Sequence, residues 1–236
     1  MSEVKEWYNS YVINQSAVGV NIRHYHLINQ IIDDGLRSES SVLEVGCGIG
    51  TLTTLLAQIV RRGKILVTDI SDRSILTAKE NLKKFKNIDY IVTDMVDFHS
   101  DDKFDFIILP DVIEHIPIEQ HNNLFGALSK LLKNDGKLII HIPHPLSLEY
   151  VRKNMPEKLQ VIDQSLFPDH IASILLNNNL LLFKFLAYSL ITFEPDYIYI
   201  MAKPIYELKM SPISSNKIRI LKSFERIKFF IKKIMT

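Results

Sequence analysis

Between residues 41 and 143 the chain alternates short apolar runs with amphipathic segments, and this alternation is the strongest constraint on its fold. Runs rich in Val, Ile and Leu predict buried strands, and spacings of three and four between apolar residues predict helices. The expected strands are 41–45, 64–69, 88–94, 104–111 and 137–143, and the expected helices are 51–62, 71–85 and 118–132. Repeated strand–helix alternation predicts an α/β fold, a mostly parallel sheet with helices on both faces.

The flanking regions are less regular. Two helical segments precede the alternating region, and two further helices and two strands follow it. The strands are joined by Glu194-Pro195, which predicts an antiparallel hairpin at the edge of the sheet. These helices are expected at 2–15, 19–35, 146–154 and 169–177, and the strands at 180–193 and 196–203. We expect three parts: an N-terminal helical region (1–36), an α/β domain (37–205), and a linker with a C-terminal helix (206–236).

The segment 216–235 predicts a basic amphipathic helix. Its apolar positions alternate spacings of four and three, which forms one seam. Three interpretations are open: the seam packs on the protein's own core or in a homodimer, it lies on an anionic membrane, or it binds a polyanion such as nucleic acid. The seam consists of Ile220, Phe224, Ile227, Ile231 and Ile234, and the basic residues are Lys217, Arg219, Lys222, Arg226, Lys228, Lys232 and Lys233.

Length, charge and composition indicate a small globular protein and give no sign of nucleic-acid binding or of a membrane span. The length of 236 residues suits one domain with a small appendage, and a net charge of +1 gives no global argument for nucleic acid. Cys47 is the only cysteine, so no internal disulfide is possible, which fits a reducing compartment. The first residues carry no apolar signal core, and the apolar stretch 171–193 is interrupted by three asparagines and a lysine. We therefore expect a soluble, cytoplasmic protein.

The stretch VLEVGCGIG (42–50) carries the first functional signal. A strand that runs into a glycine-rich turn and then a helix is typical of dinucleotide and nucleoside sites, because glycines allow positive φ and close approach of a ligand. The helix that follows supplies free amide donors. Here the glycines follow G-x-G-x-G, and Thr51 stands where the dinucleotide pattern has its third glycine. The spacing therefore argues against a pyrophosphate.

Three acids accompany this loop. Asp69 ends the second expected strand, where a carboxylate can accept both ribose hydroxyls, although dehydrogenases place an acid there as well. Asp94 ends the third strand, where it can accept a hydrogen bond from an adenine amino group. Glu44 lies in the strand before the loop, and an acid there suits a ligand with an ammonium and a sulfonium, since phosphates would be repelled.

VLEVGCGIG, Asp69 in VTDIS, Asp94-Met95 and LPDVIEHI follow in order, and together they resemble class I S-adenosylmethionine-dependent methyltransferases over residues 40–145. The resemblance implies a Rossmann-like, seven-stranded sheet whose last strand is antiparallel, with S-adenosylmethionine as cofactor. It assigns residues 46–48 of the glycine loop to the methionine part, Asp69 to the ribose, Ile70, Asp94 and Met95 to the adenine, and the residues after the fourth strand to the sulfonium. The implied cofactor residues are Glu44, Gly46, Cys47, Gly48, Gly50, Asp69, Ile70, Asp94, Met95, Pro110, Asp111 and Val112.

The segment DVIEHIP (111–117) is the richest candidate for the chemistry of methyl transfer. Asp111, Glu114 and His115 are spaced so that a short turn could bring them together, and the pattern is similar to the E-x-x-E-H segment of ubiquinone-type O-methyltransferases. In those enzymes the segment can hold a divalent cation such as Mg²⁺, but Asp111 replaces the family's glutamate. The alternative is that Glu114 and His115 make local hydrogen bonds and shape the floor of the cofactor site.

Histidines supply the remaining candidates. His144 lies beyond the fifth strand and is our candidate general base, whereas His141 lies within the strand and is expected to be packed. His121 is expected on the surface. The family resemblance implies that the N-terminal helices form a lid over the cofactor. In such a lid we expect Arg23 to bind the cofactor carboxylate, Tyr11 to help close the site, and His24 to face the acceptor. The alternative for this segment is a solvated helix face.

We therefore predict S-adenosylmethionine-dependent methyl transfer to a small-molecule acceptor, at oxygen, with S-adenosylhomocysteine as product. The alternatives are N-methylation of a small amine or amino sugar, an NAD-dependent oxidoreductase, and a protein that binds the cofactor without catalysis. No N/D-P-P-Y/F segment follows the fourth strand, where LPDVIEH stands instead. A nucleic-acid substrate is not expected.

Overall fold

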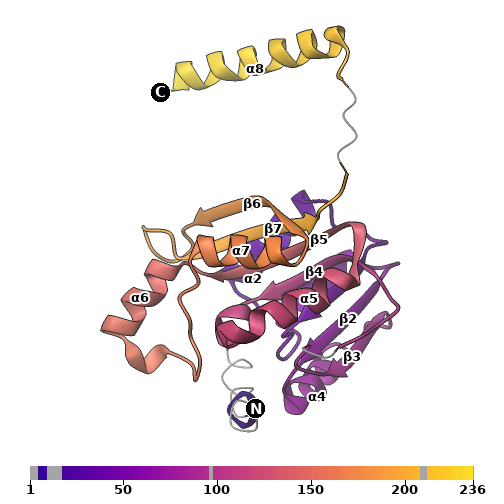
Figure 1. Cartoon of the computed structure of the whole chain (residues 1–236), viewed down its shortest axis with the longest axis vertical. Coiled ribbons are helices and arrows are strands. Elements are labelled where there is room, and N and C mark those ends of the chain that lie inside the picture. The colour runs from indigo at the N-terminus through magenta and orange to yellow at the C-terminus, as the bar shows by residue number, and fades with distance from the viewer. Residues whose placement is uncertain (1–4, 10–17, 96–97, 208–211, 236) are drawn as a thin grey trace. The chain divides into compact units, whose positions relative to one another are not determined.

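The computed structural model describes residues 5–9, 18–95, 98–207 and 212–235, apart from the side chains of residues 232 and 235 (Figure 1). The chain divides into two compact units, Met1–Ile205 and Tyr206–Thr236. Tyr11, which we expected to close the site, lies outside the described residues. No helix in the described part of the chain is long and apolar enough to cross a membrane.

The first unit is built on a seven-stranded sheet with the order β3-β2-β1-β4-β5-β7-β6. Strands β1 to β5 pair in parallel, while β7 is antiparallel to both β5 and β6. The predicted α/β sheet with an antiparallel last strand is confirmed, and β6 lies at the edge as the hairpin predicted. The strands are β1 (Ser41–Val45), β2 (Lys64–Asp69), β3 (Ile88–Val92), β4 (Phe104–Pro110), β5 (Leu132–Pro143), β6 (Leu180–Tyr188) and β7 (Tyr197–Pro204).

Helices cover both faces of the sheet, and each face has its own apolar core. Along β4, Ile107 and Leu109 face the core that α5 and α7 complete, whereas Phe106 and Ile108 face the core that α2, α3 and α4 complete. Figure 1 shows α5 and α7 together on one face of the sheet. The helices of this unit are α2 (Ile22–Asp33), α3 (Thr51–Ile59), α4 (Asp72–Asn81), α5 (His121–Leu131), α6 (Pro145–Asn154) and α7 (Pro168–Asn177).

A run of residues typical of a turn lies inside a strand, where the sequence pattern predicts the strand only from residue 137. Asn134-Asp135-Gly136 lies inside β5, which begins at Leu132 and not at residue 137. The pairing of β5 with β4 shifts register between Phe104 and Phe106, so a bulge accommodates the irregular residues while the strands stay paired. A Cβ on Gly136 would lie 2.8 Å from the carbonyl oxygen of Phe104. Close backbone approach, rather than chain reversal, is the reason for this glycine.

The second unit contains one helix, α8 (Ser215–Met235). The amphipathic helix expected at 216–235 agrees with α8, which begins one residue earlier.

Two short 3₁₀ turns in the first unit, η1 (Ile113–His115) and η2 (Ile118–Gln120), follow β4 and lead into α5. They place the DVIEHIP segment beside the carboxyl ends of the parallel strands, where α/β proteins bind ligands.

Candidate functional site

The glycine loop turns sharply at the end of β1 and is held against β2. Gly46, Gly48 and Gly50 have φ values of 73°, 54° and 83°, in the left-handed region that favours glycine. The backbone N–H groups of Gly46 and Cys47 both donate to the carbonyl oxygen of Thr68, at 2.8 and 2.9 Å. A Cβ on Gly46 would lie 2.5 Å from Cγ2 of Val112. The alternating glycines are therefore required by the backbone conformation of the turn and by its contact with the segment after β4.

Two buried acids flank this loop. Asp69 accepts hydrogen bonds from the backbone N–H groups of Gly48 and Ser71, both at 2.8 Å, so it fixes the loop to the end of β2. Burial raises the pKa of Asp69, and these two amides oppose the rise. Glu44 Oε2 accepts a hydrogen bond of 2.7 Å from Oγ1 of Thr53 on α3. Burial raises the pKa of Glu44 to about 8, and Oε1 has no hydrogen-bond partner among the described residues.

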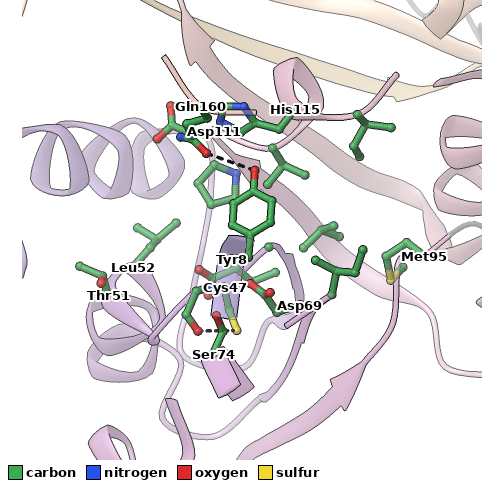
Figure 2. A pocket seen from close by; sticks show the side chains of 18 of the residues that line it. Tyr8, Cys47, Thr51, Leu52, Asp69, Ser74, Met95, Asp111, His115 and Gln160 are labelled. Atoms are coloured by element: carbon green, nitrogen blue, oxygen red, sulfur yellow. Dashed lines mark hydrogen bonds between the residues drawn. The ribbon is translucent and has the colours of Figure 1, made fainter. Parts of the chain in front are cut away.

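A cavity of ≈ 390 Å³ opens above the carboxyl ends of β1 to β4, a size typical of small-ligand sites. Most of the expected site residues line it, and Figure 2 shows Cys47, Asp69, Met95, Asp111 and His115 among them. Gly50, Glu114 and His144 do not line it. The cavity brings together residues from four strand ends and from α2. The expected residues that line it are Arg23, His24, Glu44, Gly46, Cys47, Gly48, Asp69, Ile70, Asp94, Met95, Pro110, Asp111, Val112 and His115.

The structure also adds cavity residues that sequence reasoning missed. Tyr8 reaches across the cavity, and its hydroxyl donates to Oε1 of Gln160 at 3.2 Å (Figure 2). Ile162 and Gln120 line the same side. Tyr8 lies three residues from Tyr11 in the same aromatic segment, so the composition of this segment was a usable signal. Residues 160–162 belong to an irregular stretch with no pattern that could have identified them.

Helical residues 5–9 bridge the mouth of the cavity. Lys5 pairs with Asp72 at the start of α4, at 3.4 Å, and the side chains of Ser71 and Asn9 form a hydrogen bond of 2.5 Å. On the opposite side Tyr8 contacts Gln160, as described above. These contacts join α4 to the segment after α6 through residues 5–9, and the N-terminal lid stays a prediction.

Arg23 binds a protein carboxylate in this structure. Its Nη1 lies 2.7 Å from Oδ2 of Asp111 and donates to the hydroxyl of Tyr197 at 3.0 Å. Burial opposes ionisation of Asp111, but Arg23 and His141 outweigh it and hold the pKa at about 2. Asp111 also has a left-handed φ of 53°. The Arg23–Asp111 pair therefore joins α2 to the floor of the cavity, next to the place where we expected the sulfonium.

His141 is packed, as predicted for a residue inside β5. It is fully buried, its ring stacks on Tyr197 at 4.8 Å, and Nε2 lies 2.6 Å from the hydroxyl of Tyr188. Nδ1 of His141 lies 3.6 Å from Oδ1 of Asp111, and this contact lowers the pKa of that carboxyl. His141 therefore supports Asp111 from behind and does not face the cavity.

His115 is the cavity histidine with the most defined orientation. Its Nδ1 lies 2.6 Å from the carbonyl oxygen of Ile162 and 3.1 Å from Oδ1 of Asp163, and Nε2 lies 3.8 Å from Oε1 of Glu114. Burial lowers the pKa of His115, but Glu114 and Asp163 outweigh burial and raise it to about 9. Burial raises the pKa of Glu114 to about 8. A carbonyl oxygen at Nδ1 fixes the ring proton there, which leaves the lone pair of the neutral ring on Nε2.

The possible metal site is not formed. In the part of the chain that the structure describes, no group of three or more His, Cys, Asp or Glu side chains is arranged to hold a metal ion. The reason is local: Asp111 pairs with Arg23, while Glu114, on η1, is buried and is not part of the cavity wall. Of the two residues in the alternative interpretation, His115 lines the cavity and Glu114 only contacts His115 from behind.

Three other histidines differ in their surroundings. His144, our candidate general base, lies beyond β5 as the N-cap residue of α6, and the structure does not bring it to the cavity. His121 is fully buried and not on the surface, because Nε2 lies 2.8 Å from the carbonyl oxygen of Ile116 and Nδ1 lies 3.0 Å from His170. His24 lines the cavity. Burial and the charge of Arg23 lower its pKa to about 4.

Cys47 is a small apolar residue of the loop. Its side chain is 5 % exposed, and burial raises the pKa of the thiol well above its usual value. A thiol in this state is a poor nucleophile. Met95, by contrast, is conformationally unusual: it is buried and has a φ of 67° at the cavity wall. Strained backbone at Met95 and Asp111 is typical of ligand sites, where the surrounding structure must hold it.

Residues 42–136 match the protein family described as a methyltransferase domain. The malonyl-[acyl-carrier protein] O-methyltransferase 1 of Ilyobacter polytropus is 31% identical over 109 residues, 46% of this chain and 40% of that protein. The mitochondrial ubiquinone biosynthesis O-methyltransferase of Dictyostelium discoideum is 27% identical over 181 residues, 66% of this chain and 55% of that protein. The chain thus spans about half the length of these curated relatives.

Solved structures share the fold. The magnesium protoporphyrin IX methyltransferase of Synechocystis PCC 6803, crystallised with bound S-adenosylhomocysteine, matches with a TM-score of 0.68 and 20% identity. The match covers 86% of this chain and 99% of that one. Proteins named as N-methyltransferases are among the similar proteins as well. The matches therefore share a methyltransferase domain and a fold, but differ in the atom that is methylated.

The Arg23–Asp111 pair predicts a pH-dependent stability. The pKa of Asp111 falls from 3.8 to about 2 on folding. The ionised carboxylate therefore adds to the free energy of unfolding above pH 4, and this contribution is lost as the pH falls through 2. We expect Asp111→Asn to lower the free energy of unfolding by about 2 kcal/mol at pH 7, and by less toward pH 3. Asparagine suits this position because it tolerates the left-handed backbone.

Urea unfolding of the wild type and the variant at both pH values measures this effect. Asp89→Asn, at an exposed position on β3, is the matched control and should change the free energy of unfolding by less than about 0.5 kcal/mol. A deficit for Asp111→Asn that is equal at pH 7 and pH 3 would show that the ion pair is not its cause.

Proposed function

We propose that the protein transfers the methyl group of S-adenosylmethionine to a small-molecule acceptor, because residues 42–136 match a methyltransferase domain, similar proteins are named as methyltransferases, and a solved methyltransferase shares the fold. S-adenosylmethionine supplies the electrophilic methyl group and leaves as S-adenosylhomocysteine. The observation that carries the proposal is the charge of the cavity. Its loop end is lined by three acids: Glu44 on β1, Asp69 at the end of β2, and Asp94 just after β3, which are neighbouring strands.

This set of acids fits a cationic cofactor. Oε1 of Glu44 is buried without a hydrogen-bond partner among the described residues, so an ammonium group would satisfy it and favour its ionised form. Asp69, at the end of β2, is placed to accept the ribose hydroxyls. A pyrophosphate lacks a comparable partner, because the one arginine that lines the described cavity, Arg23, is already paired with Asp111. The NAD-dependent alternative is therefore disfavoured.

We place the acceptor on the other side of the cavity, near Asp111, His115 and Gln160. His115 is the proposed general base for an oxygen acceptor, since its Nδ1 is held by the carbonyl of Ile162 and Nε2 is left to take the proton. The pairing of Asp111 with Arg23 makes Asp111 a positioning residue for the cavity floor. Tyr8 and its contact with Gln160 would exclude water during transfer, which is a requirement of in-line displacement at carbon.

Methylation at nitrogen is the second candidate, because similar proteins include N-methyltransferases. A neutral amine needs orientation but no base, so the two candidates differ in their need for His115. The oxygen acceptor has the support of the DVIEHI segment and of the two O-methyltransferase relatives.

The cofactor is tested by thermal unfolding with S-adenosylhomocysteine and with NAD. A ligand that binds only the folded state stabilises it by about 2.7 kcal/mol at a hundredfold excess over Kd, so we expect S-adenosylhomocysteine to raise Tm by about 5–10 °C. Asp69→Asn should reduce this shift, and Asp89→Asn should retain it. A shift with NAD alone would contradict the proposal.

The base is tested by the pH dependence of the rate, once an acceptor has been found among phenols, sugars and amines. A base must be deprotonated, so the wild-type rate with an oxygen acceptor should rise with pH toward the pKa of His115, about 9. His115→Gln should lower the rate about 10²–10⁴-fold and remove this rise. A rise that persists in His115→Gln and follows the pKa of an amine acceptor would favour methylation at nitrogen instead.

A further inference from the structure

Helix α8 exposes an unusual amount of apolar surface. Its 21 residues extend about 30 Å, and every large apolar side chain given below is 45–84 % exposed. Contiguous apolar surface of this kind usually marks an interaction site. The exposed residues are Ile218, Ile220, Leu221, Phe224, Ile227, Phe229, Phe230, Ile231 and Ile234.

The apolar and basic residues are sorted around the helix axis. At about 100° per residue, six of the apolar positions fall within an arc of about 120°, which we call the apolar arc. Basic residues border the arc on both sides, and Glu225 is the single acid between 215 and 235. Seven basic residues against one acid give the helix a net charge of +6. The arc contains Ile220, Phe224, Ile227, Phe230, Ile231 and Ile234, with Arg219, Lys222, Arg226 and Lys233 on one border and Lys217, Lys228 and Lys232 on the other.

We propose that α8 binds the surface of an anionic membrane. In this arrangement the apolar arc enters the boundary between headgroups and acyl chains, and the helix axis lies parallel to the surface. Lysine and arginine on both borders reach outward to the phosphates, with their alkyl parts beside the arc. This inference is independent of the proposed methyl transfer, since it rests on the second unit alone.

A homodimer through the same seam fits the charges less well. The spacing of Ile220, Phe224 and Ile227 is compatible with a coiled coil, but the positions beside such a seam carry no acid that could pair with a basic residue of a second copy. Glu225 is already bound to Lys228 of its own helix, at 2.8 Å. Two helices of +6 would also repel each other. An anionic surface neutralises this charge and covers the arc at the same time.

A nucleic-acid partner would account for only half of the pattern. Phosphate contacts need lysine and arginine, but they leave isoleucine and phenylalanine side chains in water. Arg226 also lies over the ring of Phe230, at 5.7 Å, so one border residue is already in contact with the arc. The joint placement of apolar and basic groups is what a lipid surface recognises.

Vesicle sedimentation of the full chain tests the proposal. We expect binding to vesicles of phosphatidylcholine with about 30% phosphatidylserine, little binding to pure phosphatidylcholine, and a fall in binding as salt is raised to about 0.5 M. Ile227→Gln with Ile231→Gln removes the centre of the arc and should weaken binding at least about tenfold. Ile218→Gln with Phe229→Gln, on the opposite side of the helix, is the matched control and should retain binding.

Three results would overturn the proposal. One is equal binding to neutral and anionic vesicles. Another is absence of vesicle binding together with a dimer, measured by light scattering, that the Ile227/Ile231 variant dissociates. The third is absence of vesicle binding together with binding to a 20-nucleotide duplex that the same variant retains. The Tm shift with S-adenosylhomocysteine should be equal in all of these variants, so failure of this proposal is distinguishable from failure of the proposed function.

Discussion

The tight turn after β1 is the constraint on which the rest of the site depends. Three left-handed glycines reverse the chain, and the amides of Gly46 and Cys47 share the carbonyl oxygen of Thr68 on the neighbouring strand. Asp69 accepts a further amide from the loop, at Gly48. The same hydrogen bonds that hold the turn therefore bring the acids of β1 and β2 to one end of the cavity. A side chain at Gly46 would displace Val112 and with it the segment after β4.

Electrostatics divide the cavity into two ends. Glu44 lies at one end, where burial raises its pKa to about 8 and thus disfavours its charge in the absence of a cation. At the other end Arg23 keeps Asp111 ionised, with a pKa of about 2. A buried carboxylate is favourable only with a partner; among the described residues Asp111 has the cationic partner Arg23, whereas Glu44 has the neutral hydroxyl of Thr53 and leaves Oε1 without a hydrogen bond. Glu44 is therefore the group that favours a positively charged ligand.

The parts that could be predicted from the sequence are those with local causes. The strand–helix alternation, the glycine turn, and the acids at the strand ends follow from short-range patterns, and the sheet order and cavity agree with them. The residues that the sequence analysis placed wrongly or missed owe their positions to contacts between distant segments. His121 is buried because His170, on α7, meets it, and Tyr8 joins the cavity through Gln160, 152 positions away. The bulge in β5 likewise depends on its pairing with β4, which the Asn-Asp-Gly run does not reveal.

The most direct test of this account is a crystal structure of the protein with S-adenosylhomocysteine. We expect the ribose hydroxyls within hydrogen-bond distance of the Asp69 carboxylate, the ammonium group at Glu44, and the sulfur directed toward Asp111 and His115. A complex with this ligand outside the cavity, or with its ammonium group remote from Glu44, would contradict the central claim that the buried acids around the glycine turn select a cationic cofactor.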